Sequence, residues 1–172
     1  MTFALRRVPG SSARLVGADF SHTMLQRAVA KSEGSAAAPE WIEADALNLP
    51  FPDARFELVT SAFGFRNLAN YEAGLREIHR VLAPGGEVGI LDFGQPEGFM
   101  GDLYHFYFRH VLPRVGTVVS GVRGPYQYLP TSVQRFPAPA IMLERMRGAG
   151  FEAVSWAPYT FGIAGLFRGR KR

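Results

Sequence analysis

The chain has 172 residues, 47% of them hydrophobic and 20% charged, with a net charge of +4 and no cysteine. These ordinary globular values exclude a disordered or low-complexity chain and favour one domain over residues 1–172 with a core of its own. The lack of cysteine excludes disulfides and thiolate metal sites. Because no apolar run is long enough to span a membrane either, we expect a cytoplasmic protein.

Short apolar segments alternate with helical patterns in the first half of the chain. Residues 14–18 (RLVGA) predict a buried strand, and Ser21 is placed to cap a helix over residues 24–30. Residues 41–43 (WIE) predict a second short strand, and residues 56–60 (FELVT) predict a third. Strands and helices that alternate in this way indicate a parallel sheet.

The next helix and strand carry clearer patterns. Asn70 is placed to cap a helix whose apolar residues recur on one face, and residues 84–86 (PGG) end it. Residues 87–93 (EVGILDF) predict the best strand of the chain. Because this strand is apolar on both sides of its middle, we expect helices on both faces of the sheet.

The second half of the chain begins with an insertion over residues 99–137 that is rich in Phe, Tyr and Arg. Its aromatic side chains either line a slot for a flat ring and its tail, contact a membrane, or form plain core. Residues 140–147 then predict a last helix, and residues 151–156 and 162–168 predict a closing hairpin. The basic residues at 168–172 have no interleaved aromatics, so we expect a solvated end and no nucleic-acid partner.

Two carboxylates follow the ends of predicted strands, where an open α/β sheet holds a nucleoside. Asp19 can accept hydrogen bonds from the vicinal hydroxyls of a ribose, or it can open the helix that follows as a cap. Asp45 can contact a ligand or stabilise a turn. The four histidines of the chain show no metal-site spacing, so no metal is expected.

Several linked blocks of the sequence are more specific than any single motif. They are Asp45-Ala46 and residues 49–53 (LPFPD), 61–67 (SAFGFRN), 80–86 (RVLAPGG), 128–130 (YLP) and 135–137 (RFP). In this order and spacing, from about Leu5 to Gly169, the chain resembles the C-methyltransferases of ubiquinone and menaquinone biosynthesis. The resemblance implies an α/β, Rossmann-like class I methyltransferase sheet with helices on both faces. It also implies S-adenosyl-methionine as cofactor and a prenylated quinol as substrate.

The resemblance implies a role for the polar residues at the strand ends. On the cofactor side, Asp19 would bind the ribose, Asp45 would accept from the adenine amino group, and the N–H of Ala46 would donate to an adenine nitrogen. Ser61 would lie near the sulfonium end of the cofactor.

The loop that carries Arg66 and Asn67 would face the acceptor ring in the resembling family. Methylation of a ring carbon requires removal of a phenolic proton, after which that carbon attacks the sulfonium methyl. Arg66 stays protonated, so it would stabilise the phenolate or position a water molecule as a donor. The alternative is that Arg66 and Asn67 only order the loop.

One feature of the family is missing from the sequence. A first strand and a turn of the type Asp-x-Gly-x-Gly-x-Gly-Asp precede, in that family, the helix that is expected here near residues 1–7. We therefore expect a chain that is truncated at its start and binds S-adenosyl-methionine weakly or not at all. A noncatalytic remnant that serves as an interaction module is the alternative, and a nicotinamide oxidoreductase is a weaker one. An unpaired sheet edge would also favour a homodimer.

Overall fold

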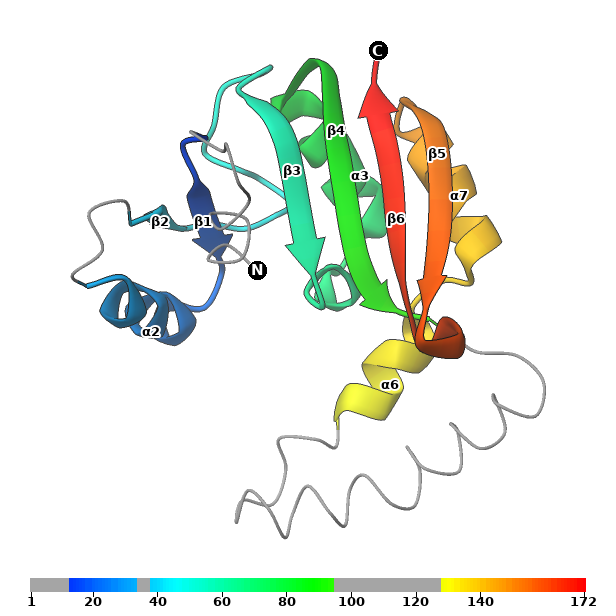
Figure 1. Cartoon of the computed structure of the whole chain (residues 1–172), viewed down its shortest axis with the longest axis horizontal. Coiled ribbons are helices and arrows are strands. Elements are labelled where there is room, and N and C mark those ends of the chain that lie inside the picture. Colours follow the sequence, from blue (N-terminus) through cyan, green and yellow to red (C-terminus); the bar gives the residue numbers. More distant parts are fainter. Residues whose placement is uncertain (1–12, 34–37, 95–127) are drawn as a thin grey trace, which may run out of the picture. The chain divides into compact units, whose positions relative to one another are not determined.

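The computed structural model describes residues 13–33, 38–94 and 128–172 and divides into two compact units, unit 1 (residues 1–52) and unit 2 (residues 53–172) (Figure 1). Most of the expected insertion at residues 99–137, including its aromatic stretch, lies outside the described residues. None of the described helices is long and apolar enough to cross a membrane. The expected single domain and homodimer stay predictions.

Unit 1 is built from two strands and a helix. Strand β1 (Val16–Asp19) and strand β2 (Glu40–Glu43) pair in parallel, and helix α2 (His22–Ser32) connects them. Ser21 caps α2 as the sequence predicts, because its hydroxyl accepts a hydrogen bond of 3.4 Å from the N–H of Met24. The helix begins two residues before the predicted start at residue 24 and also ends later than predicted.

The packing of unit 1 depends on Trp41. Its ring lies directly over Gly17 on the neighbouring strand, where a Cβ atom would come within 2.2 Å of the ring. Its indole N–H donates to Ser32 Oγ at 2.9 Å and thereby ties β2 to the end of α2. The ring of Trp41 therefore requires glycine at position 17, because even the methyl group of alanine would clash with it.

Unit 2 contains a four-stranded sheet in the order β3-β4-β6-β5. Strands β3 (Phe56–Ala62) and β4 (Leu82–Phe93) are parallel, whereas β6 (Ala164–Lys171) runs antiparallel to both β4 and β5 (Phe151–Tyr159). The predicted parallel pairs and the closing hairpin are confirmed. The strands of the two units form separate sheets.

Two helices of unit 2, α3 (Tyr71–Val81) and α7 (Pro139–Gly148), lie on one face of this sheet (Figure 1). Under them, β4 buries every second side chain, namely Val88, Ile90 and Asp92, as the two-residue period of a strand requires. The core cluster joins these helices to the sheet and contains Leu75, Ile78, Met142, Met146, Phe151 and Phe167. A helical layer on the opposite face stays a prediction.

Helix α3 ends earlier than its sequence pattern suggests. Asn70 caps it as predicted, with its side chain accepting from Ala73 N–H at 2.9 Å, but the helix stops at Val81 and Leu82 already begins β4. The ammonium of Lys171 explains this end, because it donates to the carbonyls of His79 and Leu82 at 2.7 and 2.8 Å. A residue far along the chain thus satisfies the helix terminus.

Three shorter elements belong to unit 2 as well. Helix α6 (Tyr128–Arg135) precedes α7, and the 3-10 turns η1 (Phe65–Asn67) and η3 (Thr160–Gly162) follow β3 and β5. Both turns come after the carboxyl end of a strand. Because β3, β4 and β5 all run in the same direction, their carboxyl ends lie at one edge of the sheet.

Candidate functional site

The two candidate cofactor carboxylates of unit 1 lie at the same edge of its small sheet. Asp19 is the last residue of β1, and it is opposite Glu43, the last residue of β2. The N–H of Ala44 donates to the carbonyl of Asp19 at 3.1 Å, and Asp45 follows directly. The parallel pairing therefore brings Asp19 and Asp45 to neighbouring strand ends, as expected from the sequence.

One oxygen of each carboxylate is used by the local backbone. Asp19 Oδ1 accepts from the N–H of Ser21 at 2.8 Å, and Asp45 Oδ1 accepts from the N–H of Leu47 at 2.9 Å. The turn role considered for Asp45 is thus present, whereas the cap of α2 is Ser21 and Asp19 binds only the N–H of that capping residue. Each side chain is exposed, and its Oδ2 accepts no hydrogen bond from the residues that the structure describes. The second oxygen of each carboxylate is available to a ligand.

The backbone of the turn after β2 adds a donor next to Asp45. Asn48 N–H donates to the Asp45 carbonyl at 3.0 Å and closes the turn, whereas the N–H of Ala46 donates to none of the described residues. Ala46 is half-buried. A carboxylate acceptor and a free backbone donor are therefore adjacent, which is the pattern that one edge of an adenine ring requires.

On unit 2, the loop after β3 is fixed by Asp92, which is fully buried at the end of β4. Its Oδ2 accepts from the backbone N–H of Arg66 at 3.0 Å, and its Oδ1 accepts from the guanidinium Nη1 of the same residue at 3.0 Å. The N–H of Phe93 donates to Oδ1 at 2.9 Å. A single carboxylate thus holds both the backbone and the side chain of Arg66.

The guanidinium of Arg66 is almost completely enclosed, with a side chain that is 5% exposed. Its Nη1 also donates to the carbonyl of Phe63, and its Cζ lies 5.0 Å from the ring centroid of Phe93, a cation–π contact. Its Nε is buried and has no hydrogen-bond partner among the described residues. Buried polar groups are nearly always satisfied, so this N–H is an exception among the described residues.

Asn67 occupies a different environment from Arg66, although the two residues are adjacent. Its backbone N–H donates to the Gly64 carbonyl at 3.0 Å, and its side chain is exposed. The η1 turn is anchored instead by Phe65, which is 2% exposed and stacks on Tyr71 at a ring distance of 5.9 Å. The loop therefore presents Asn67 outward from a fixed base.

Tyr71 supports the same loop from α3. Its hydroxyl donates to the carbonyl of Arg66 at 3.0 Å. Burial is the main cause that raises the pKa of Tyr71, so it stays a neutral donor at physiological pH. Both backbone groups of Arg66 are consequently fixed, one by Asp92 and the other by Tyr71.

Ser61 lies on β3 in register with Ile90 and is half-buried. Paired residues of parallel strands share a face, so Ser61 points to the face that carries α3 and α7. Its hydroxyl lies near Gly64, where a Cβ atom would be 3.6 Å from Ser61 Oγ. Its expected place near the cofactor's sulfonium stays a prediction.

Asp92 is the residue that the sequence analysis did not single out. The signal for it was a charged residue inside the apolar run of residues 88–93 (VGILDF), because a buried carboxylate requires a cationic or N–H partner. No group of three or more potential metal ligands occurs in the part of the chain that the structure describes.

Comparison with known proteins identifies the family. The sequence model of the ubiE/COQ5 methyltransferase family matches residues 1–171. The chain is 49% identical, over 95% of its length and 73% of the relative's, to a demethylmenaquinone methyltransferase of Thermus thermophilus. It is 48% identical to the enzyme of the same name from Deinococcus radiodurans, over 92% of its own length and 66% of that protein. The UbiE protein of Cronobacter sakazakii is 37% identical over 99% of the chain and 69% of that protein.

Solved structures agree on the fold. A SAM-dependent methyltransferase from Aquifex aeolicus superposes with a TM-score of 0.69 at 16% identity, covering 98% of this chain and 74% of that one. The [4+2]-cyclase SpnF superposes with a TM-score of 0.70 at 18% identity, over 98% of this chain and 69% of its own. The second protein is named for a different reaction, so this likeness shows the fold and not the activity. By its sequence, the chain belongs to the ubiE/COQ5 methyltransferase family.

Proposed function

We propose that this chain is the methyl-transferring part of an S-adenosyl-methionine-dependent C-methyltransferase whose acceptor is a prenylated quinol. The match of the family model to residues 1–171, with relatives named for demethylmenaquinone, is the observation that carries the proposal. The chain spans 66% to 73% of the length of the first two relatives, so the activity of the whole protein is part of the proposal.

The residues of unit 1 fit the adenosyl group of this cofactor. Asp19 and Asp45 each keep one carboxylate oxygen open, and the N–H of Ala46 is unused by the described residues. In the proposal, Asp19 holds the ribose hydroxyls, while Asp45 and Ala46 contact the adenine edge. A carboxylate accepts hydrogen bonds from hydroxyl or amino groups, and these bonds are stronger than those that a neutral side chain would accept.

The loop of unit 2 fits the acceptor side. When bound, the cofactor supplies an electrophilic methyl group, and the protein has to orient the acceptor and assist the loss of its hydroxyl proton. We place the exposed amide of Asn67 against the quinol oxygen. The unpartnered Nε of Arg66 would hold the water that accepts the proton, since an arginine side chain can only donate.

The buried pair with Asp92 sets how Arg66 acts. Its positive charge is largely compensated by that carboxylate, 3.0 Å away, so a direct charge effect on a phenolate is reduced. The proposed contribution of Arg66 is therefore the geometry of one donor and of the loop that carries Asn67. Enclosure of the pair within unit 2 keeps this geometry fixed between turnovers.

Transfer of an isotopically labelled methyl group tests the proposal. The chain is incubated with S-adenosyl-methionine carrying a ¹³C methyl group, at millimolar concentration because weak binding is expected, and with a short-tailed demethylmenaquinol. Mass spectrometry should show one labelled methyl on a ring carbon, and Asn67→Ala should reduce its rate of formation while leaving the unfolding free energy unchanged. No labelled product, although the cofactor binds, would favour the noncatalytic alternative.

A further inference from the structure

The hairpin that joins β5 to β6 ends in exposed aromatic side chains. Tyr159 is 50% exposed and Phe161 is 80% exposed. Residues 156–167 (WAPYTFGIAGLF) contain no charged residue. Large apolar side chains of this exposure usually stand singly on a protein surface, whereas here they share one uncharged turn.

The backbone of this turn, called here the aromatic tip (residues 157–163), is strained. Thr160 and Phe161 have positive φ angles of 50° and 57°, in the left-handed region that non-glycine residues rarely occupy. Neither side chain is buried, so packing against the core does not account for the conformation. Positive φ angles are typical of the tight turns that join antiparallel strands, and this turn leaves the Phe161 ring exposed.

The aromatic tip lies at the same sheet edge as the Arg66 loop. Strand register pairs Ala164 with both Tyr159 and Phe93, and the N–H of Gly94 donates to the carbonyl of Ile163 at 2.9 Å. Phe93 in turn contacts Phe63 at a ring distance of 4.9 Å. Phe63, Phe93, Ala164 and Tyr159 therefore form an apolar strip between the loop that carries Arg66 and the tip.

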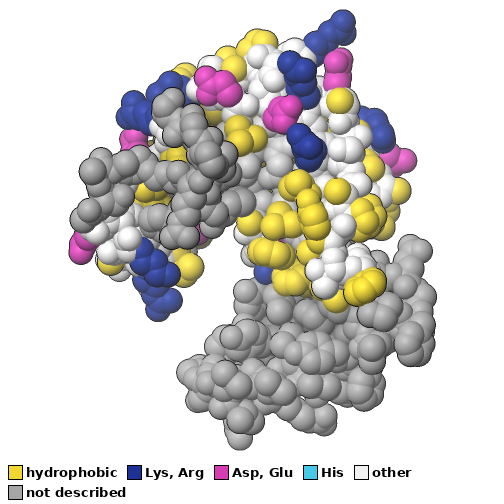
Figure 2. Space-filling model, in the orientation of Figure 1, with side chains coloured by type: hydrophobic (Ala, Val, Ile, Leu, Met, Phe, Trp, Pro, Cys, Tyr) yellow, Lys and Arg dark blue, Asp and Glu magenta, His cyan; other side chains and the backbone are white. Residues whose placement is uncertain are grey.

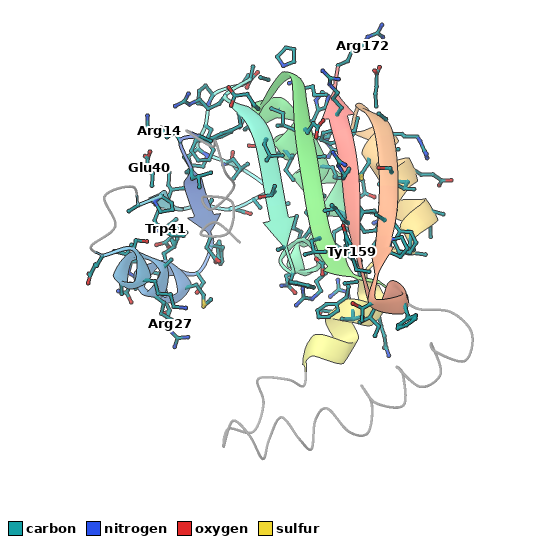
Figure 3. All side chains as sticks on the ribbon, in the orientation of Figure 1. Arg14, Arg27, Glu40, Trp41, Tyr159 and Arg172 are labelled. Atoms are coloured by element: carbon teal, nitrogen blue, oxygen red, sulfur yellow. The ribbon has the colours of Figure 1, made fainter. Side chains whose placement is uncertain are left out.

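The basic residues of β6 and of the chain end lie away from this strip, and the charged pair next to it, Arg66 and Asp92, is buried. Figure 3 shows Tyr159 and Arg172 at opposite ends of the four-stranded sheet. The basic residues of β6 and the chain end, residues 168 and 170–172, follow the strand away from the tip. In Figure 2, hydrophobic side chains gather at the end of the sheet that bears the hairpin. The partner that fits the tip is thus apolar and uncharged.

We propose that the aromatic tip inserts into the surface of a lipid bilayer, without a requirement for anionic lipid. Tyr and Phe are suited to this position, since their rings bury apolar area at the interface and Tyr keeps its hydroxyl in water. The purpose of this insertion rests on the proposed function. A prenylated quinol is dissolved in the bilayer, and the apolar strip lies between the aromatic tip and the Arg66 loop. Binding of the tip to a bilayer can be measured in an assay that does not involve methyl transfer.

Flotation with vesicles of phosphatidylcholine, which carries no net charge, tests the insertion on the whole chain. The wild-type chain should float with the vesicles, and Phe161→Ser and Tyr159→Ser should each weaken partitioning by about tenfold, since each removes one exposed aromatic ring from the lipid. Ile141→Ser is the matched control, because Ile141 is an apolar residue of α7 with 48% exposure, and its partitioning should stay at the wild-type value.

A second variant reports the contact directly. Phe161→Trp keeps the aromatic ring, so it should partition as the wild type does, and its added fluorescence should be quenched by brominated phosphatidylcholine. Three results would overturn the proposal: no flotation of the wild type, an equal loss in Ile141→Ser, or flotation that needs anionic lipid and disappears in Arg170→Ala. Methylation of a tail-free quinol in vesicle-free buffer separates the two proposals, because it depends on the proposed function and not on the tip.

Discussion

Unit 1 and unit 2 differ sharply in how much apolar surface they bury. In unit 2, two helices and four strands enclose a cluster that includes Leu75, Ile90, Met146 and Phe167, each at most 2% exposed. In the described part of unit 1, Leu25 and Pro39 are the buried apolar side chains. Two-stranded sheets are marginally stable by themselves. The candidate cofactor residues thus lie on the weakly packed unit, and the acceptor loop lies on the well-packed one.

The difference in packing shows which parts of the candidate site are fixed before a ligand binds. The Arg66 loop is held by a buried carboxylate, an aromatic stack and a tyrosine hydroxyl. Asp19 and Asp45 are held mainly by their own turns. A cofactor that binds unit 1 should therefore stabilise it by mass action, while unit 2 should change little.

Removal of the carboxylate at the base of the loop should have the largest effect. Asp92→Ala leaves the guanidinium of Arg66 buried and without its counter-charge, which costs about 3–5 kcal/mol. Urea unfolding followed by circular dichroism measures the loss. Arg168→Ala, which breaks the exposed pair with Glu87, is the control and should cost less than about 1 kcal/mol. Comparable losses in the two variants would contradict the role given to Asp92.

Truncation of a core side chain compares the two units directly. Leu75 is fully buried on α3, so Leu75→Ala should lower the unfolding free energy of unit 2 by about 2–5 kcal/mol. Leu25→Ala, in α2, should leave the transition of unit 2 unchanged. Hydrogen exchange of the β4 amides follows unit 2 alone. Faster β4 exchange in Leu25→Ala would show that the units are coupled.

The cap on α3 should contribute less. Lys171→Ala removes donors to the carbonyls of His79 and Leu82, and hydrogen bonds from a charged group are worth about 1.5–3 kcal/mol. Thermal unfolding measures the change. The control is Arg172→Ala, which removes the charge of the residue next to Lys171. The Arg172 side chain is 90% exposed, so the effect on the unfolding free energy should be within about 0.5 kcal/mol. Equal effects would mean that charge, and not the cap, is responsible.

The smallest expected effect is a pH dependence at His79. Burial is the first cause that lowers its pKa below the usual 6.5, and the nearby charge of Lys171 is the second. Because the unfolded chain binds this proton more readily, stability is complete above pH 6.5 and falls as the pH drops through the lowered folded pKa. His79→Phe, which keeps the edge contact with Phe151, should flatten the melting temperature between pH 7 and pH 5 relative to wild type. An unchanged pH profile would exclude His79 as the cause.

Local patterns in the sequence were sufficient for most of the fold. The caps at Ser21 and Asn70, the parallel strand pairs and the closing hairpin follow from spacing and side-chain chemistry, and all are confirmed. The end of α3 was not predictable, because it depends on the ammonium of Lys171 at the far end of the chain. Long-range partners of this kind leave no local signal.

The candidate site divides in the same way. The places of Asp19 and Asp45 at neighbouring strand ends follow from their positions after two predicted strands. The enclosure of Arg66 by Asp92 does not follow, since it requires that residues 26 positions apart meet across two strands. The sequence therefore identified the loop, and the structure adds which of its side chains is enclosed.

Titration of the ¹⁵N-labelled chain with S-adenosyl-homocysteine, observed by NMR, shows whether the strand ends at Asp19 and Asp45 hold the cofactor. We predict chemical-shift changes at the amides of Ser21, Ala46 and Leu47, saturating at millimolar ligand and lost in a variant that carries both Asp19→Ala and Asp45→Ala. Guanosine, which has a carbonyl in place of the adenine amino group, should leave the amides of Ala46 and Leu47 unchanged at the same concentration. Shifts that avoid the three amides, or guanosine shifts at Ala46 and Leu47, would contradict the assignment of this strand edge to the adenosyl group of the methyl donor.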